Sequence, residues 1–338
     1  MSLNVGVIGC GYWGPNLVRN FQAMDEVEVA ALCDVNPRRL VRISRQYPAI
    51  KLVTEDPDAI LESPDIDCVV LATPVSTHYE LGMKALGQGK HLFVEKPFTA
   101  TSRQAEDLIN RAEQKNLRIM VDHTFLYTGA VRVIKDFIES GRLGDIFYFD
   151  SVRVNLGLFQ HDINVIWDLA PHDVSIMDFL LPEPPEAITA AGVAHFDQDI
   201  ENIAYISAWH PGNLLGHIHV NWLAPVKVRK TLISGSKKMI VYDDTEPSEK
   251  VKIYDRGVEM IENKDEIYDI LIQYRTGDML APKIDLTEAL RRVVREFYDA
   301  IDQSRPAFTD GRSGLRVVRV LEAANESMRN GGRAIELR

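Results

Sequence analysis

The sequence lacks several features that mark whole classes of protein. No apolar run approaches the roughly 18 residues that cross a bilayer, and no basic leader precedes the first predicted strand. Only three cysteines occur, Cys10, Cys33 and Cys68, and their spacing fits neither a disulfide framework nor a zinc site. Internal repeats and low-complexity tracts are absent as well. We therefore expect a cytoplasmic protein with buried, reduced thiols and no membrane partner.

The sequence also has fewer basic than acidic residues. The 38 Lys and Arg residues are outnumbered by 49 Asp and Glu, which gives a net charge of -11. Nucleic-acid binding needs a basic surface, so this balance argues against such a partner. A length of 338 residues, 46% of them hydrophobic, suits two globular domains that each bury a core.

The first 124 residues alternate apolar strands with amphipathic helices. Strands are predicted near residues 3–8, 27–33, 51–53, 68–72, 91–94 and 118–121, and helices over residues 37–47, 76–88 and 102–115. Such an order predicts an α/β domain whose parallel sheet is covered on both faces. Ligands of these domains bind at the carboxyl ends of the strands.

A glycine-rich turn follows the first strand. Gly9, Gly11 and Gly14 have the GxGxxG spacing, Pro15 suits the first turn of a helix, and Asp34 ends the second strand. This is the dinucleotide-binding fingerprint, in which the glycines permit a tight turn and close approach to a pyrophosphate. The alternative is a plain glycine turn in another α/β protein.

Asp34 bears on the choice of cofactor. A carboxylate there accepts hydrogen bonds from the adenosine ribose hydroxyls and repels a 2'-phosphate, so NAD is favoured over NADP. Arg38 and Arg39 follow it closely. They would either stack on adenine or reach a phosphate, or else belong to a solvated helix turn.

The pattern changes from about residue 145. Period-two segments over residues 146–154, 187–194, 202–209, 214–222, 230–234 and 238–242 predict a largely antiparallel sheet with one open face. Helices are expected over residues 167–180, 286–303 and 313–329, the last two packing back on the first domain, and residues 263–285 are expected to form a loop over the site. We thus predict domains over residues 1–124 and 125–338.

Two motifs fall at strand ends of the first domain: Thr73-Pro74 and Glu95-Lys96-Pro97. An ammonium at Lys96, near a nicotinamide, would bind a substrate oxygen and stabilise its alkoxide character. Pro97 would restrict the backbone before it. The alternative for Lys96 is an ordinary surface lysine.

Asp168 and His172 are four residues apart, which places them on one face of a helix. A helix that begins near Trp167 would hold Pro171 in its first turn, and its positive end would favour an ionised Asp168 and a neutral His172. A neutral imidazole oriented by a carboxylate can act as a general base. The alternative is an N-terminal cap beside a satisfied histidine.

Together these residues resemble the glucose-fructose oxidoreductase, inositol dehydrogenase and MocA-like oxidoreductase family. The resemblance rests on residues 9–14, on Ala72-Thr73-Pro74 with His78, on Glu95-Lys96-Pro97, and on Asp168 with His172, which occur in the family's order. It implies that Lys96, Asp168 and His172 form the catalytic set of an NAD-dependent sugar dehydrogenase. The chain departs from the family pattern at residues 164–167, which replace a glycine-rich lead-in.

The remaining site residues follow from the motifs and the resemblance. The cofactor-binding candidates are Gly9, Gly11, Tyr12, Trp13, Gly14, Asp34, Arg38, Thr73, Pro74, His78 and Glu95. The substrate-binding candidates are Lys96, Arg153, Asn164, Trp167, His172, Lys227 and Arg229.

Within the family, residues 11–16 and 167–173 resemble members that oxidise the 3-hydroxyl of UDP-linked N-acetyl sugars or their uronic acids. A nucleotide-sugar diphosphate needs cations, for which Arg153, Lys227 and Arg229 are candidates, although they could equally form a solvent-facing basic edge. His217 and His219 share a strand face, but no third ligand is apparent, so we expect no metal.

Other functions stay open at this point. A dehydrogenase of inositol or of a free sugar uses the same residues, and some relatives bind the cofactor as regulators without catalysis. An open apolar sheet face seldom stays bare, so we expect a homodimer or homotetramer formed through it.

Overall fold

The computed structural model describes residues 2–157, 160–196, 200–261 and 271–337, and the chain divides into two compact units. Unit 1 comprises Met1–Tyr127 and Thr287–Arg319, and unit 2 comprises Thr128–Leu286 and Val320–Arg338. The chain thus passes from unit 1 to unit 2 three residues after the boundary expected at residue 124, and it returns to unit 1 near its C-terminal end.

Unit 1 contains a six-stranded parallel sheet in the order β3-β2-β1-β4-β5-β6. The strands are β1 (Leu3–Ile8), β2 (Val27–Cys33), β3 (Leu52–Thr54), β4 (Cys68–Leu71), β5 (His91–Val94) and β6 (Ile119–Val121). The chain order reverses between β1 and β4, and ligands of such sheets bind at that reversal.

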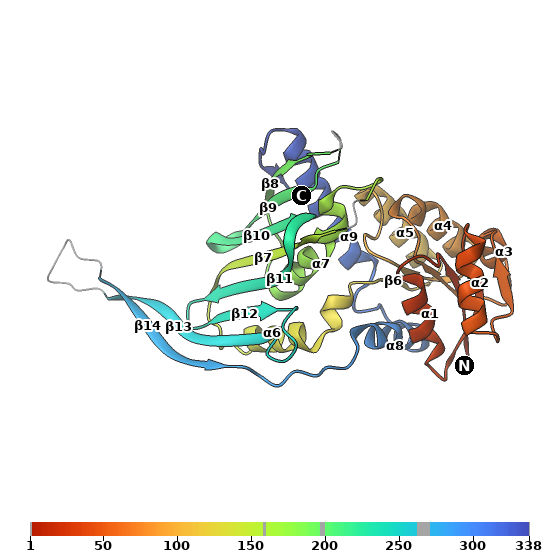
Figure 1. Ribbon diagram of the computed structural model, residues 1–338, viewed down its shortest axis with the longest axis horizontal. Coiled ribbons are helices and arrows are strands. Elements are labelled where there is room, and N and C mark those ends of the chain that lie inside the picture. Colours follow the sequence, from red (N-terminus) through yellow and green to blue (C-terminus); the bar gives the residue numbers. More distant parts are fainter. Residues whose placement is uncertain (1, 158–159, 197–199, 262–270, 338) are drawn as a thin grey trace. The chain divides into compact units, whose positions relative to one another are not determined.

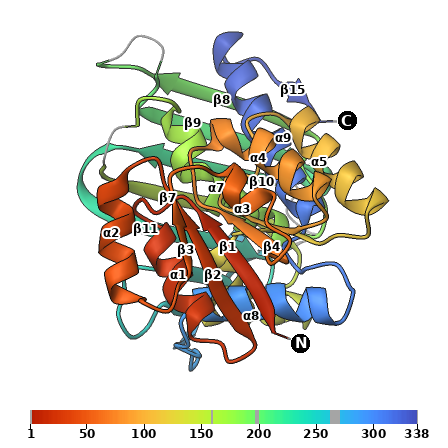
Figure 2. The same ribbon diagram turned by 90° about the vertical axis from the view of Figure 1, so that its right-hand side faces the viewer.

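Helices cover both faces of this sheet, with α1 and α2 on one side and α4 and α5 on the other (Figure 2). They are α1 (Gly14–Gln22), α2 (Pro37–Gln46), α3 (Asp58–Leu61), α4 (Val75–Gly87), α5 (Ser102–Gln114) and α8 (Ala289–Asp302), with a 3-10 turn η1 (Thr124–Tyr127). The doubly covered parallel sheet confirms the architecture predicted from the sequence.

Aromatic side chains connect the C-terminal part of unit 1 to its sheet. Phe297 of α8 meets Phe21 of α1 and Phe93 of β5, with ring centroids 6.4 and 5.5 Å apart, and all three are fully buried. Edge-to-face pairs of this kind stabilise a core beyond the area that they bury. A helix from the end of the chain thus completes a core begun at residue 3.

Unit 2 contains a nine-stranded sheet in the order β14-β13-β12-β11-β7-β10-β9-β8-β15. Its strands are β7 (Ile146–Leu156), β8 (Ala187–Val193), β9 (Ile203–His210), β10 (Leu214–Asn221), β11 (Leu223–Gly235), β12 (Met239–Asp243), β13 (Val251–Ile261), β14 (Leu271–Leu280) and β15 (Ile335–Glu336). The pair β7–β10 is parallel and the other pairs are antiparallel, which agrees with the prediction of a largely antiparallel sheet.

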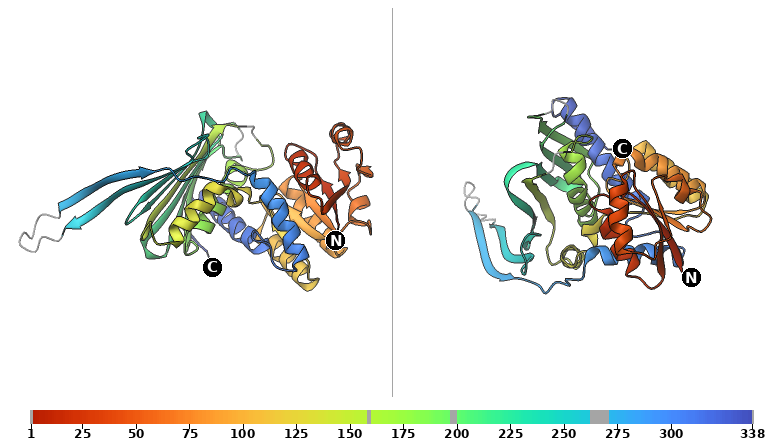
Figure 3. Two further views of the ribbon diagram at one scale, coloured as in Figure 1. Left: turned by 90° about the horizontal axis from the view of Figure 1, so that it is seen from below. Right: turned by 45° about the vertical axis from the view of Figure 1, so that its right-hand side comes forward.

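One face of this sheet is packed and the other is open. Side chains of β9 alternate: Ala204, Ile206 and Ala208 are buried, whereas Tyr205 and Trp209 are about half exposed. Figure 3 shows α6 (Gly129–Glu139) and α7 (Val165–Leu180) on one side of the sheet. The open face predicted from the period-two pattern is therefore present.

Part of unit 2 differs from expectation. Residues 271–280 belong to β14, which pairs with β13, so they are not the loop that the sequence predicts over residues 263–285. Residues 263–270 of that expected loop lie outside the described residues. The β13–β14 hairpin lies at one edge of the sheet (Figure 1). Charged residues interrupt the alternation of apolar and polar side chains that would have predicted its strands.

The remaining elements are the 3-10 turn η2 (Pro211–Asn213) and α9 (Gly311–Arg329), whose first residues belong to unit 1 and whose last belong to unit 2. Across the described ranges, no helix combines the length and apolar character needed to cross a membrane. Cys10, Cys33 and Cys68 are buried free thiols, as predicted.

Candidate active site

The glycine turn after β1 tolerates no side chain at two of its three glycines. A Cβ at Gly9, where φ is +101°, would lie 2.4 Å from the Ala72 carbonyl oxygen, and one at Gly14 would lie 2.1 Å from the Gly9 oxygen. At Gly11 the nearest group is Arg39 Nη1 at 3.7 Å. Gly9 and Gly14 thus allow β1, β4 and α1 to pack closely, whereas Gly11 leaves open space in front of the backbone.

The start of α1 has the properties of an anion site. No side chain caps the helix, and among the described residues nothing accepts a hydrogen bond from the backbone N–H groups of Gly11, Tyr12 or Gly14. The positive end of the helix dipole adds to these donors. Tyr12 is 89% exposed beside them.

Asp34 directly follows β2, and its carboxylate binds the backbone of the glycine turn. Its Oδ2 accepts the Cys10 N–H at 2.7 Å, and its Oδ1 accepts the Asn36 N–H at 2.8 Å. A carboxylate has about four lone-pair sites, so acceptor capacity remains for ribose hydroxyls. Arg39 Nη1 lies 3.5 Å from Oδ2, whereas Arg38, the predicted cofactor contact, is exposed to solvent. These groups fit a dinucleotide with an unmodified ribose.

His78, a predicted cofactor-binding residue, has backbone oxygens beside both of its ring nitrogens. Its Nδ1 lies 3.0 Å from the Pro97 oxygen and 3.2 Å from the Phe98 oxygen, and its Nε2 lies 2.9 Å from the Thr73 oxygen. The ring is buried, which lowers its pKa. The one N–H of the neutral ring donates to a carbonyl oxygen on one side, and His78 packs between the end of β4 and the turn after Lys96.

The Glu95-Lys96-Pro97 motif follows β5 as predicted, and the Lys96–Pro97 peptide bond is cis. Glu95 is buried, and its Oε2 accepts the Lys96 backbone N–H at 3.2 Å. Its carboxyl group therefore packs largely inside unit 1, and its role as a cofactor-binding residue stays a prediction. Lys96 itself is partly exposed.

Two neighbours of this motif were not predicted. Asp122 and His123 follow β6, the strand beside β5, and both are 1% exposed. Asp122 accepts hydrogen bonds from Trp13 Nε1 at 3.2 Å and Thr124 Oγ1 at 2.5 Å. Their position directly after the apolar run Ile119–Val121 was the available signal, because it is the same strand edge that carries Lys96.

In unit 2, Asp168 and His172 lie on α7, but the helix begins at Val165, earlier than predicted. Pro171 is therefore an interior residue of α7 and not a first-turn residue, and His172 is a full turn beyond Asp168. Because a helix dipole acts mainly within the first turn, it favours the charge of Asp168 and acts little on His172. This corrects the expectation that the dipole keeps His172 neutral.

Trp222 is a site neighbour that the sequence did not reveal. Its indole Nε1 donates to Asp168 Oδ2 at 3.0 Å, and the side chain is fully buried after β10. The charge-assisted hydrogen bond orients the carboxylate. No local motif connects residues 54 positions apart, which explains why this contact was missed.

Two predicted substrate ligands at the start of α7 are structural. Asn164 caps the helix by accepting the Trp167 N–H at 3.3 Å, and its Nδ2 donates to Glu201 at 2.8 Å and Asn325 at 3.0 Å. Both amide hydrogens are used. Trp167 is 8% exposed and belongs to the core of unit 2.

The predicted diphosphate cations differ in availability. Arg153 is buried and bonded twice to Asp173, at 2.5 and 3.2 Å, so it offers no cation to a ligand and the prediction is corrected. Arg229 lies 3.3 Å from Asp244 and stays partly exposed. Lys227 is exposed on the same strand. Of the three, Lys227 and Arg229 remain candidates.

His217 and His219 lie on β10 as predicted. His217 Nδ1 is 2.9 Å from Asp150 Oδ1, and Tyr205 stacks on His219 with ring centroids 4.4 Å apart. Among the described residues, no group of three or more His, Cys, Asp or Glu could hold a metal ion.

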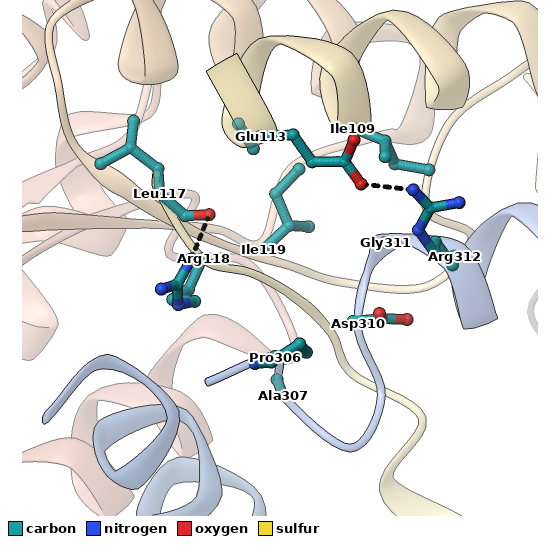
Figure 4. A pocket seen from close by; sticks show the side chains of 11 residues that line it. Ile109, Glu113, Leu117, Arg118, Ile119, Pro306, Ala307, Asp310, Gly311 and Arg312 are labelled. Atoms are coloured by element: carbon teal, nitrogen blue, oxygen red, sulfur yellow. Dashed lines mark hydrogen bonds and ion pairs between the residues drawn. The ribbon is translucent and has the colours of Figure 1, made fainter. Parts of the chain in front are cut away.

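A cavity of about 120 Å³ lies in unit 1 between α5 and the start of α9 (Figure 4). Apolar side chains such as Ile109 and Ile119 line it, and Glu113 binds Arg312 at its edge at 2.5 Å. None of the predicted cofactor or substrate residues lines this cavity. It is therefore separate from the glycine turn and from Lys96.

Comparisons with known proteins identify the family of this chain. A family model described as an oxidoreductase family with an NAD-binding Rossmann fold matches residues 3–123, and a model of the GFO/IDH/MocA C-terminal domain matches residues 131–241. UDP-N-acetylglucosamine 3-dehydrogenase of Acidithiobacillus ferrooxidans is 26% identical, over 94% of this chain and 95% of that protein.

Two further comparisons add to this. An uncharacterized oxidoreductase of Streptococcus pneumoniae is 29% identical over 56% of this chain, which spans 54% of that protein's length. A solved levoglucosan dehydrogenase in complex with NADH superposes with a TM-score of 0.84 at 19% identity and covers 100% of both chains, a likeness that shows the fold.

Proposed function

Because the chain belongs to the Gfo/Idh/MocA family of NAD-binding oxidoreductases, we propose that it oxidises a hydroxyl group of a sugar to a ketone. The observation that carries the proposal is the coexistence of a glycine turn open at Gly11, backed by Asp34, with Lys96 at the end of β5. The first two groups suit NAD, and the third supplies a cation at the same edge of the sheet.

The chain would hold NAD with the N–H groups at the start of α1 on the pyrophosphate and Asp34 on the adenosine ribose. When bound, NAD supplies a nicotinamide ring that accepts a hydride. Lys96 would bind the substrate oxygen with its ammonium group and so stabilise the negative charge that develops there as the hydroxyl proton departs.

His172 is the proposed general base, with Lys96 as the less favoured alternative. An imidazole takes the hydroxyl proton at near-neutral pH, and Asp168 orients it. Trp222 in turn holds the Asp168 carboxylate through its indole N–H. That Lys96 of unit 1 and His172 of unit 2 act on one substrate stays a prediction.

For the substrate we propose a nucleotide sugar of the UDP-N-acetylglucosamine type, oxidised at the 3-hydroxyl. The similarity to the Acidithiobacillus ferrooxidans 3-dehydrogenase over nearly the whole chain supports this choice. The exposed Lys227 and the partly exposed Arg229 supply cations for a diphosphate. We also propose that the cytoplasmic protein forms a dimer or tetramer through the open sheet face of unit 2.

The test is a spectrophotometric assay of NADH formation with NAD and a panel of UDP-sugars, inositols and free sugars. Turnover of a UDP-N-acetyl sugar is the expected result. Turnover of inositols alone would refute the substrate, and no turnover with any of them would favour a non-catalytic regulator.

A variant separates catalysis from cofactor binding. Lys96→Ala should lower kcat by about two orders of magnitude or more, because it removes a charge that stabilises the transition state. NAD affinity, measured by titration calorimetry, should stay close to that of the wild type. Near-normal turnover of Lys96→Ala would remove this lysine from the mechanism.

A further inference from the structure

The helix α7 carries Asp168 and His172, and a proline lies between them. Pro171 is an interior residue of this helix. Because proline has no N–H group, the helical hydrogen bond from residue 171 to the Trp167 oxygen cannot form. A helix bends most easily where such a bond is missing. The directions of the Asp168 and His172 side chains therefore depend on contacts outside the backbone of α7.

Beyond the proline, a buried ion pair attaches α7 to β7. Arg153 Nε donates to Asp173 Oδ2 at 2.5 Å, and its Nη2 donates to Oδ1 at 3.2 Å. Ser151, two residues earlier on the same face of β7, donates to Oδ1 at 2.7 Å. Ser151, Arg153 and Asp173 are 0%, 4% and 2% exposed. Asp173 directly follows His172 in α7, so this attachment lies next to the proposed base.

A second contact attaches α7 before the proline, on a different side of the helix. Trp222 Nε1 donates to Asp168 Oδ2 at 3.0 Å. Asp168 and Asp173 are five residues apart, which separates their side chains by about 140° around the helix axis. One attachment leaves a helix free to rotate about it, whereas two attachments in different directions determine its rotation. A buried ion pair is often no more stable than apolar residues of similar volume, so stability alone does not account for Arg153 and Asp173.

We propose that the ion pair of Arg153 and Asp173, together with Ser151, fixes the rotation of α7 and so directs the His172 imidazole and the Asp168 carboxylate. Arg153, Ser151 and Asp173 are positioning residues, because they act through α7. The catalytic role of His172 rests on the proposed function, whereas the fixed rotation of α7 does not. Arg153 thereby has a role in place of the diphosphate contact predicted from the sequence.

Two variants separate positioning from stability. Asp173→Asn keeps the shape of the side chain but leaves a buried guanidinium without its counter-charge, so its melting temperature should fall. Arg153→Met/Asp173→Leu removes both charged groups and should melt close to the wild type. Below the melting temperature of each variant, kcat for the UDP-N-acetyl sugar should fall about tenfold or more in both, because a displacement of about 1 Å can cost about a hundredfold in rate. NAD affinity, measured by titration calorimetry, should stay that of the wild type, since the cofactor-binding candidates belong to unit 1.

The matched control is Lys252→Met/Glu249→Leu. It removes a partly exposed ion pair of the same unit, with the two charged groups 3.2 Å apart, and should keep the wild-type kcat. If Arg153→Met/Asp173→Leu melted with the wild type and also turned over at the wild-type rate, the buried ion pair would be structural only and the proposal would be overturned.

A second measurement needs no enzyme activity. In the nuclear magnetic resonance spectrum of the full chain, the indole N–H signal of Trp222 reports the position of Asp168, and its loss in Trp222→Phe identifies it. This signal should shift in Asp173→Asn and, to a smaller extent, in Ser151→Ala, whereas the indole signal of Trp13 in unit 1 should not. The control variant should leave both signals in place. An unchanged Trp222 signal in Asp173→Asn and Ser151→Ala would refute the fixed rotation of α7, whereas a shifted signal in a chain that oxidises no sugar would refute the proposed function alone.

Discussion

At the scale of single residues, polar side chains within each unit are hydrogen-bonded to other groups of the same unit. Asp34, expected to bind a ribose, also fixes the glycine turn through the Cys10 N–H. Asp168, expected to orient an imidazole, is itself held by Trp222. Asp34 and Asp168 thus each have a hydrogen-bond partner within the chain as well as a proposed functional role. Mutation of the partner can separate the structural role from the functional one.

Replacing Trp222 with phenylalanine should separate them in unit 2. The change removes the donor to Asp168, and hydrogen bonds to charged groups are worth about 1.5–3 kcal/mol, so kcat should fall about tenfold or more. Steady-state kinetics measure this loss.

The control is Trp209→Phe, which changes a half-exposed tryptophan of β9. It should leave kcat close to that of the wild type. Equal kinetics for Trp222→Phe and the wild type would contradict a role for the indole.

His123 should make unit 1 sensitive to acid. Its pKa is about 3 in the folded chain, against 6.5 for an ordinary histidine, because it is buried near Arg316 and Lys96. The unfolded chain thus binds one more proton below pH 6.5, and the free energy of unfolding falls by about 1.4 kcal/mol per pH unit as pH drops from 6.5 towards 3.

Urea unfolding from pH 6.5 downward measures this loss. His123→Met, which cannot take up the proton, should lose less stability than the wild type, and His161→Met, at an exposed position, should behave as the wild type does. An identical pH dependence for the wild type and His123→Met would exclude the buried histidine as the cause.

The sequence predicts local structure well around the candidate site. The spacing of Gly9, Gly11, Gly14 and Asp34 predicts a tight turn and a strand end, and the structure has both. Residues with distant partners were misjudged: Arg153 reads as a cation for a ligand until Asp173 is placed beside it. Such partners depend on the packing of the whole unit, which spacing along the chain does not specify.

At the scale of elements, the three glycines of the turn before α1 have different structural roles. Gly9 and Gly14 are required by neighbouring backbone, and Gly11 faces open space. Most predicted boundaries lie within a few residues of the observed ones, but β11 begins at Leu223 where residue 230 was predicted, and α6 was not predicted. The hairpin of β13 and β14 was missed because its alternation is interrupted by charge.

Alanine substitutions distinguish the glycines. Gly14→Ala should destabilise the fold, because its Cβ would lie 2.1 Å from the Gly9 oxygen and backbone must shift. Gly11→Ala should fold as the wild type does, since only Arg39 Nη1 lies within 4 Å, yet its methyl group would occupy the approach to a pyrophosphate. We expect its NAD affinity to fall about tenfold or more, at an unchanged melting temperature.

Thermal unfolding and calorimetric titration with NAD read the two effects independently. Gly87→Ala, where a Cβ meets nothing within 4 Å, is the matched control and should retain both stability and affinity. Full NAD affinity in Gly11→Ala would argue against this turn as the pyrophosphate site.

At the scale of the whole molecule, the open sheet face of unit 2 is the surface through which we expect the chain to self-associate. Leu215 of β10 pairs with Tyr148 of β7 on one side and Trp209 of β9 on the other, which forms an apolar row across three strands. Tyr148 and Trp209 are 38% and 50% exposed. Contiguous apolar patches of this kind mark interaction sites.

Trp209→Glu should therefore dissociate the protein, because burying a carboxylate in an apolar interface is costly. Sedimentation velocity should give a dimer or tetramer for the wild type and a monomer for the variant. Val53→Glu, on an exposed position of unit 1, should keep the wild-type assembly. A monomeric wild type would contradict the proposed interface.

The aromatic contact of α8 has a consequence for how the protein is made. When the ribosome has synthesised β1 to β6, the nascent chain lacks Phe297, and the rings of Phe21 and Phe93 have no cover on that side. Strands β7 to β14 of the second sheet must be translated before that cover arrives. Unit 1, although encoded first, therefore cannot complete its core until most of unit 2 has been synthesised, and during that interval its uncovered aromatic surface is prone to aggregation.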